Sequence, residues 1–227
     1  MSGLILFCII CFSPGETLVY EAKFSFITLG SMVLTIDDTL EYAGTRCYFL
    51  RSELNSHASL NWLFTLHDTI EVITTVSDLT PLRYEERIHE SNHYNHSCID
   101  FDHDSLIARY DDTTWIAIES GTRDMLSFWY HLRTIPLAIN DTLSFHIHAS
   151  MENHLIDCPV VEREVIEVPI GEFNTLRVSP QTEGKGVFGA GGGMDIWYSD
   201  DAQRYPVQIK VRMKTGSIVF KLKEVSY

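Results

Sequence analysis

One stretch of this 227-residue chain carries the periodicity of an α-helix, whereas most of the remainder alternates as β-strands do. In the segment 124–135, apolar residues recur at the i, i+3, i+4, i+7 spacing of a buried stripe, at Met125, Phe128, Trp129 and Leu132. A second, polar face holds Ser127, His131 and Thr134. Asp124 can cap the first turn and Pro136 prevents a further one. The sequence therefore predicts one amphipathic helix at about 124–135, at the centre of the core. On its polar face, replacing Ser127 by Ala is expected to cost about 0.5 kcal/mol or less.

Elsewhere apolar and polar residues alternate with a period of two, which is typical of half-buried strands. The alternating segments are 18–26, 32–36, 47–54, 70–76, 82–88, 99–101, 115–118, 143–149, 160–168, 173–178, 194–198, 207–213 and 218–222. Short turns separate them, and residues 59–66 fit a brief helix. Many short strands of this kind indicate an antiparallel architecture. We expect a mainly β protein whose antiparallel strands form a partly open barrel or sandwich wrapped around the helix.

The N-terminus resembles a secretory signal. Leu4–Phe12 is an unbroken apolar run, and Ser13-Pro14-Gly15 offers small residues for cleavage before Glu16. We therefore expect a signal segment at 1–15, a single β-rich domain at 16–227, and export to the periplasm or cell envelope. The alternative is a buried first strand that is never removed, because no Lys or Arg precedes the run. Lipidation of Cys8 or Cys11 is disfavoured because the bulky Phe7 and Ile10 precede them.

Charge and cysteine content narrow the classes of partner. The net charge of −14 opposes binding to nucleic acid or to anionic lipid surfaces. Beyond the signal segment no run is apolar and long enough to span a bilayer, so an integral membrane protein is not expected. Cys47, Cys98 and Cys158 are odd in number and lack zinc-type spacing, so their disulfide pairing stays open.

The segment His89-Glu90-Ser91-Asn92-His93 matches the HExxH pattern of zinc proteases. That chemistry needs both histidines on one face of a helix, with the glutamate beside the metal-bound water. Here Ser91-Asn92 is a turn pair between alternating flanks, which favours an exposed hairpin rich in His. We therefore assign no catalytic, cofactor-binding or metal-ligating residue, and keep His89, Glu90 and His93 as the alternative metal site.

Three further sequence patterns resemble functional motifs, but each is better explained by a structural role than by a binding or catalytic one. Residues 100–104 resemble a calcium loop but lack its Gly and its bidentate Glu, so a charged hairpin tip is expected. Gly184–Gly189 matches GxGxxG but precedes more glycine and a strand, which excludes a dinucleotide site. His146 and His148 share the polar face of a strand and are expected to be exposed.

Four stretches together resemble the bacterial family called domain of unknown function 3108 (DUF3108). They are Leu79-Thr-Pro-Leu-Arg-Tyr-Glu-Glu-Arg87, the segment 124–136, the segment 168–178, and Ile196-Trp-Tyr-Ser-Asp-Asp201 with Arg204 and Pro206-Val207. The resemblance spans about residues 17–227. It implies an exported, β-rich envelope protein of unsettled function and transfers no catalytic residue. Physically, 199–201 reads as a turn, and Arg204 is expected to pair with one of its aspartates.

Two classes of function follow. The favoured one is an uncharacterised envelope protein that acts as a non-enzymatic binding or assembly factor for an apolar ligand or a partner protein. The alternative is a metal-dependent hydrolase that uses the segment 89–93. Bound zinc in one-to-one amount separates the two.

Overall fold

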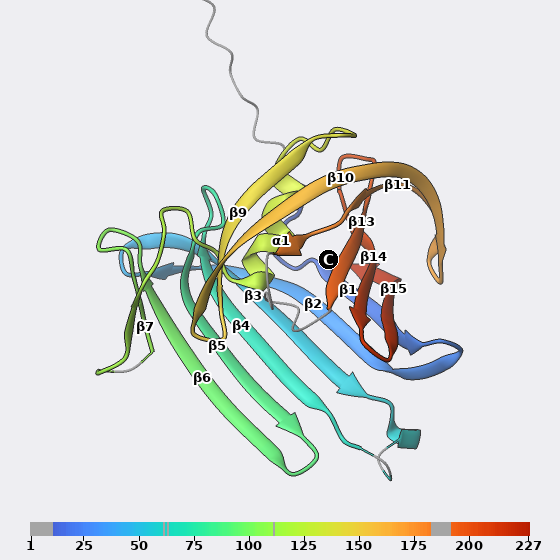
Figure 1. The fold of residues 1–227 in the computed structure, drawn as a ribbon, viewed down its shortest axis with the longest axis horizontal. Coiled ribbons are helices and arrows are strands. Elements are labelled where there is room, and N and C mark those ends of the chain that lie inside the picture. Colours follow the sequence, from blue (N-terminus) through green and yellow to red (C-terminus); the bar gives the residue numbers. More distant parts are fainter. Residues whose placement is uncertain (1–10, 61, 63, 111, 183–191) are drawn as a thin grey trace, which may run out of the picture.

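The computed structural model describes residues 11–60, 62, 64–110, 112–182 and 192–227. It shows fifteen antiparallel strands in one open sheet, with a single α-helix in the described part of the chain (Figure 1). The first eight strands are β1 (Thr17–Phe24), β2 (Ile27–Tyr42), β3 (Thr45–Ser56), β4 (His67–Thr75), β5 (Pro81–Glu90), β6 (His93–Asp102), β7 (Ile107–Arg109) and β8 (Trp115–Ala117). After the helix come β9 (Thr142–Ala149), β10 (Glu152–Val168), β11 (Gly171–Val178), β12 (Gln181–Thr182), β13 (Gly193–Ser199), β14 (Pro206–Met213) and β15 (Gly216–Ser226).

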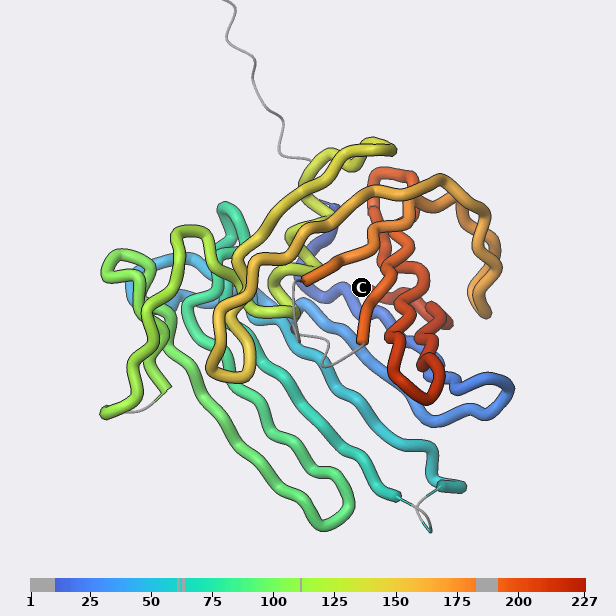
Figure 2. Tube along the Cα trace, in the orientation of Figure 1, coloured from blue at the N-terminus to red at the C-terminus, as the bar shows by residue number. Residues whose placement is uncertain are grey.

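The strand order runs β12-β10-β11-β13-β14-β15-β1-β2-β3-β4-β5-β6-β7-β8, and β9 pairs with β10. The first strand therefore joins the last one, and the sheet continues from β1 as a meander (Figure 2). In Figure 1, β10 arches across the molecule from the green strands to the red ones. The predicted fold class, mainly β and antiparallel, is confirmed. The helix expected within 59–66 is only a short 3₁₀ turn at Ala58–Leu60 in the described residues.

The helix α1 spans Met125–Thr134, as the sequence predicts. The Asp124 carboxylate accepts hydrogen bonds from the backbone N–H groups of Leu126 (2.8 Å) and Ser127 (3.0 Å), which caps the first turn. Ile135 is extended, with φ −107° and ψ 151°, because the following Pro136 disfavours the helical conformation before it.

The amphipathic pattern expected of this helix is only partly right. Phe128 and Leu132 are fully buried, but Met125 and Trp129 are half-buried. Ser127, from the face expected to be polar, is completely buried. The helix side chains belong to one core cluster with strand residues, and the helix contacts β3, β4 and β9. Six of its ten residues are buried, so burial is not confined to one stripe of the helix.

The residues just before β1 are part of the core. Gly15 and Ile36 close a backbone hydrogen bond of 2.7 Å, and the Ile36 N–H donates to the Glu16 carbonyl at 2.9 Å. Cys11 and Phe12 are buried, and the Phe12 ring meets Tyr48 and Tyr130 edge-on, with centroids 5.7 and 5.6 Å away. The segment 11–16 is therefore packed against the sheet and the helix.

The last turn of the helix holds a buried ion pair. Arg133, 1% exposed at its side chain, binds both carboxylate oxygens of the fully buried Glu16, at 2.5 and 2.9 Å. Its guanidinium also donates to the carbonyls of Cys11 and Gln203, each at 3.0 Å. Burial opposes the charge, but the hydrogen bonds with Glu16 prevail and raise the pKa of Arg133. The pair joins the start of β1, the end of α1 and the β13–β14 loop.

The loop between β13 and β14 contains the predicted turn, but one of its side chains makes a different contact from the one expected. The turn predicted at 199–201 is present, and the Asp201 carboxylate accepts the backbone N–H groups of Gln203 (3.1 Å) and Arg204 (3.0 Å). The Arg204 side chain was expected to pair with an aspartate. It instead donates to the Ile135 carbonyl at 2.8 Å, where the end of the helix leaves an acceptor free. The loop therefore caps the helix.

We predict that Ser127→Ala lowers the free energy of unfolding by about 1–3 kcal/mol, rather than the 0.5 kcal/mol expected of a polar face. Burial raises the pKa of Asp124, and the hydroxyl of Ser127, which donates to Asp124 Oδ2 at 2.5 Å, opposes that shift. The matched control is Ser144→Ala, whose Ser–Asp bond to Asp157 (2.6 Å) is exposed, with an expected cost of about 0.5 kcal/mol or less. Urea denaturation measures both; equal losses would contradict the buried cap.

We also predict that Arg133→Met lowers the free energy of unfolding by about 3–5 kcal/mol, because the carboxylate of Glu16 then remains buried without a counter-charge. Arg163→Met, which removes an exposed pair with Asp200, should cost about 1 kcal/mol or less. Adding Glu16→Gln to Arg133→Met should restore part of the stability, because the isolated charge is then gone. Denaturant midpoints that do not separate the two single variants would show that the pair is not buried.

Candidate functional site

Alternation along the strands gives the sheet an inner face, the side that packs on the helix core. Register places Leu50 beside Val72, Val72 beside Tyr84, and Tyr84 beside Ile99 in one row of this face. The next row along the strands runs Ser52, Ile70, Glu86, Ser97. In the first row Leu50, Val72 and Ile99 are buried and Tyr84 is half-buried, whereas in the next row Ile70, Glu86 and Ser97 are all half-buried. The inner face is therefore covered at the helix end and open toward the other end.

An apolar pocket of about 140 Å³ lies on the open part of the inner face, and we call it the apolar pocket. Its lining comes from β1, β2, β3, β15 and the loop after β3, namely Ala22, Leu29, Gly30, Leu54, Asn55, Ser56, Phe64, Leu66, Ile218 and Phe220. Gly30 lies within β2, where a Cβ would stand 1.9 Å from the Asn55 carbonyl oxygen. Only glycine lets the two strands approach this closely.

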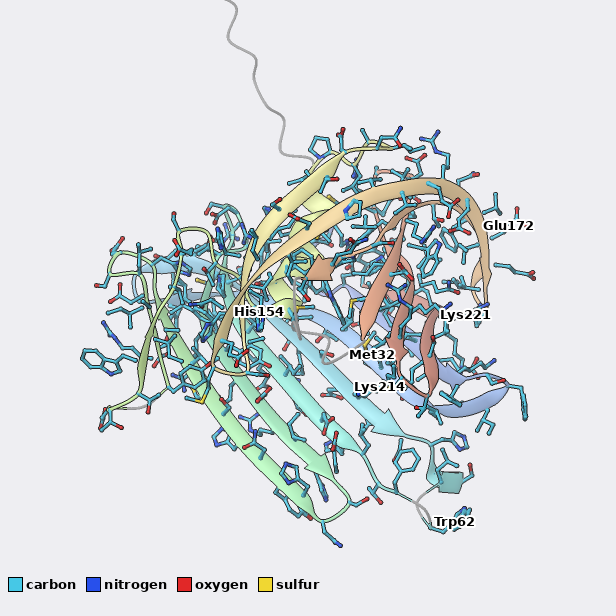
Figure 3. All side chains as sticks on the ribbon, viewed as in Figure 1. Met32, Trp62, His154, Glu172, Lys214 and Lys221 are labelled. Carbon is cyan, nitrogen blue, oxygen red and sulfur yellow. The ribbon has the colours of Figure 1, made fainter. Side chains whose placement is uncertain are left out.

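Two large aromatic side chains near this pocket in sequence are exposed to solvent. Phe26, in the β1–β2 turn, is 89% exposed, and Trp62, in the loop after β3, is 82% exposed. Figure 3 labels Trp62 at the outer tip of that loop. Large exposed aromatic side chains are typical of surfaces that bind apolar partners.

A second cavity, of about 470 Å³, lies where β5 and β6 face the β9–β10 turn, and we call it the polar cavity. It is lined by Tyr84, Glu86, Asn95, His96, Ser97, Ile99, Tyr110, Met125, His148, Ala149, Ser150 and Met151. The Tyr84 hydroxyl donates to Glu86 Oε2 at 2.7 Å. Burial, followed by the charge of Glu86, raises the pKa of Tyr84, so Tyr84 remains a donor at neutral pH.

A hydrogen-bond chain fixes the opposite wall of the polar cavity. Asn153 Nδ2 donates to the Ala117 carbonyl (2.6 Å), so its Oδ1 accepts from His148 Nδ1 (2.7 Å). His148 Nε2 is then the acceptor for the Tyr110 hydroxyl (2.8 Å), which itself accepts the Met151 N–H (3.1 Å). Burial lowers the pKa of His148, which keeps the ring neutral in this arrangement.

A third, open hollow of about 680 Å³ lies against β1, β2 and the 3₁₀ turn. Polar residues contribute much of its lining, including Glu21, Thr28, Ser31, His57 and Lys223. Glu21 and Ser31 alternate along their strands with inner-face residues, so their side chains lie on the outer side of the sheet. Its size alone does not make it a better site than the two inner-face cavities.

The residues of the HExxH pattern lie on a hairpin rather than a helix. β5 ends at Glu90 and β6 begins at His93, with Ser91 in a left-handed conformation (φ 52°) at the turn. The His89 ring stacks on Tyr94 with centroids 4.2 Å apart. Within the described residues, no group of three or more His, Cys, Asp or Glu side chains is placed to hold a metal.

The structure also tests the predicted hairpin tip at 100–104 and the predicted exposure of His148. Asp102 and Ser105 form the expected hairpin tip, with the Ser105 N–H donating to Asp102 at 2.9 Å. His148 was expected to be exposed and is 2% exposed, because Tyr110 covers it. The GxGxxG segment 184–189 lies outside the described residues. Cys47, Cys98 and Cys158 are free thiols. The Cys11 thiol donates a hydrogen bond to the Arg133 carbonyl at 2.7 Å.

Sequence reasoning missed the cavity residues. Leu54, Tyr84 and Glu86 occupy ordinary strand positions in the sequence, because alternation alone does not say which face meets the core. Tyr110 and His148 are brought together from β-segments far apart in the chain. These cavity residues can be recognised only from the pairing of the strands, which is known only once the structure is known.

No helix in the described part of the chain is long and apolar enough to cross a membrane. Comparison with curated proteins gives no match. Among solved structures, the chain is similar to the beta-barrel-like DUF1849 protein of Brucella abortus, with 7% identity, a TM-score of 0.62, and 93% of this chain and 96% of that one covered. At this identity the likeness shows a shared fold alone.

Two further structures match at a TM-score of 0.41, which is too low to support an argument. One is a candidate lipoprotein of Parabacteroides distasonis, 10% identical over 94% of this chain and 96% of that one. The other is a candidate exported protein with a YmcC-like fold from Bacteroides fragilis, 12% identical over 95% and 97%.

The sequence itself matches a family model over residues 19–223, which is nearly the whole chain. The family is described as proteins of unknown function, DUF3108. The stretches that carried the resemblance lie inside this range, at strands, turns and the helix that the structure describes. The chain therefore belongs to the DUF3108 family.

Proposed function

We propose that this protein is an exported, non-enzymatic binding protein that holds an apolar ligand on the open part of its inner face. The observation that carries the proposal is the apolar pocket, whose lining includes Leu54, Phe64, Ile218 and Phe220. A folded domain gains stability by covering such side chains, so an open apolar pocket is retained for binding. Its volume of about 140 Å³ holds only part of a ligand, so the remainder would lie along Ile70 and the rim.

The fold supports this use in a second way. We propose that the curved sheet wraps around α1, which fills one end of the inner face and leaves the other end free. The helix end is tied by Arg133 to Glu16 and by Arg204 to the Ile135 carbonyl, so the filled end is rigid. A preformed face loses little conformational entropy when a ligand binds.

We propose the periplasm or cell envelope as the location, because Leu4–Phe12 has the length and apolarity of a signal segment. Cleavage before Glu16 would keep the partner of Arg133 but remove the Phe12 ring and the Cys11 carbonyl from the core. We propose that site, and N-terminal sequencing of the mature protein decides between it and the retained segment, in which Cys11 and Phe12 keep their places in the core.

We predict that the purified protein binds the neutral apolar fluorophore N-phenyl-1-naphthylamine saturably, and that Leu54→Glu weakens this binding about tenfold or more. The substitution places a carboxylate in the apolar pocket, where desolvating it is costly. Fluorescence titration gives the dissociation constants.

The matched control is Ile73→Glu, which adds the same charge at an outer position of β4, next to Arg83 in the register. It should bind the fluorophore as the wild type does. Equal affinity of Leu54→Glu and wild type, with unchanged denaturant midpoints, would overturn the ligand site. Absence of saturable binding in the wild type would favour a partner protein instead.

For the alternative hydrolase, we predict that the double variant His89→Ala, His93→Ala keeps the wild-type fold and fluorophore binding. The two histidines stand on opposite arms of the β5–β6 hairpin and so lack a three-ligand face. Zinc measured after mild dialysis should be well below one per chain in the wild type. One tightly held zinc per chain, lost in the double variant, would support the enzyme.

A further inference from the structure

The two faces of the sheet differ in how their charges are paired. On the outer face, Arg51 of β3 and Arg83 and Arg87 of β5 sit in a ladder of ion pairs that crosses the strands. Arg51 pairs with Glu71 at 3.2 Å, Arg87 pairs with Glu71 at 2.8 Å and Glu85 at 2.6 Å, and Arg83 pairs with Asp100 at 2.9 Å. The positive charge of Arg51, Arg83 and Arg87 is therefore directed away from the inner face.

On the inner face, Glu86 has no cationic partner. Its neighbours in the register are Ile70 and Ser97, and the Tyr84 hydroxyl binds its Oε2. No Lys, Arg or His among the residues that the structure describes makes an ion pair with it. Glu86 Oε1 is thus free to accept a further hydrogen bond. A carboxylate that is half-buried without a counter-charge is costly, and a bound cation would remove that cost.

Among the residues that the structure describes, Glu86 is also the only acidic one that lines the polar cavity. The two histidines of its lining do not compensate it. His96 bonds to Glu85 at 2.9 Å, and His148 is held neutral between Asn153 and Tyr110. The field in the cavity is therefore negative, and the net charge of −14 reinforces it.

The walls of the cavity suit the rest of a small molecule. Tyr84 and Tyr110 offer aromatic surfaces, while Ile99, Met125 and Met151 offer aliphatic ones. The volume of about 470 Å³ lies in the range of small-molecule sites. Aromatic rings beside a carboxylate attract ammonium and guanidinium groups through their quadrupoles. A divalent metal would need several oxygen ligands, and one carboxylate does not supply them.

The geometry points to the polar cavity as a binding site for a small organic cation, an ammonium group on an apolar chain. Its charge pairs with Glu86, and its chain lies against Tyr84, Tyr110 and Met125. This site shares no lining residue with the apolar pocket, so the proposal is independent of the function proposed above.

The test uses n-hexylammonium as the probe and ¹³C-methyl methionine NMR on the full chain. Met125 and Met151 line the cavity, whereas Met32, Met194 and Met213 lie outside its lining and act as internal controls. We expect hexylammonium to shift the Met125 and Met151 methyl signals saturably and to leave the other three in place. Hexanoate, with the same chain length and the opposite charge, should leave all five unchanged at the same concentration. Binding of the apolar fluorophore at the apolar pocket should persist in both cases.

Glu86→Gln should weaken hexylammonium binding about tenfold or more, because it removes a charge-assisted contact. Glu86→Asp, which keeps the charge, should retain the preference for hexylammonium over hexanoate. The matched control is Glu53→Gln, on the outer face of β3, which makes the same change in net charge. It should bind as the wild type does.

Three results would overturn the site. They are the absence of saturable shifts at Met125 and Met151 in the wild type, equal shifts with hexanoate, and unchanged affinity in a folded Glu86→Gln variant. If Glu86→Gln does not fold, salt dependence decides in the wild type. Raising the ionic strength should weaken hexylammonium binding, and no change would contradict an ion pair.

Discussion

The ion pair between Glu16 and Arg133 is the contact on which the architecture depends. Both side chains are buried, so each would be costly alone. The guanidinium also lies over the rings of Phe12, Tyr130 and Tyr205, with centroids 5.1–5.5 Å away. One side chain thereby joins the entry to β1, the end of α1 and the loop between β13 and β14. These are parts of the chain that an open sheet would otherwise leave independent of each other.

Fixing the helix end in this way divides the inner face into two regions. Toward the helix, Leu50, Val72, Phe128 and Leu132 form a closed core with little or no exposure. Away from it, the same strands continue with half-buried residues and the two cavities. A closed barrel would cover both regions, whereas the open strand order leaves one of them accessible. The binding function that we propose follows from this unequal coverage.

The sequence predicts local structure well because its signals are local. The helix bounds follow from the capping by Asp124 and from Pro136, and both are confirmed. The turns at 91–92 and 199–201 are also where their residues predict them. Family membership followed from four short stretches, and the family model now covers 19–223.

Features that depend on distant segments were not predictable. The spacing predicts a polar, exposed face at Ser127, yet this side chain is completely buried. Arg204 was assigned to the nearest acids and instead caps the helix at Ile135. Glu86 has the same alternating context as Glu85, and only the strand register shows that one faces the cavity and the other the outer ladder.

We propose that the open inner face exists to hold an apolar ligand. Native mass spectrometry of the protein, purified from its own cells without detergent, tests this most directly. We expect a chain that carries one non-covalent apolar adduct, released on collisional activation and soluble in organic solvent. A population at the mass of the bare chain, or a chain that keeps one metal ion and no organic adduct, would contradict it.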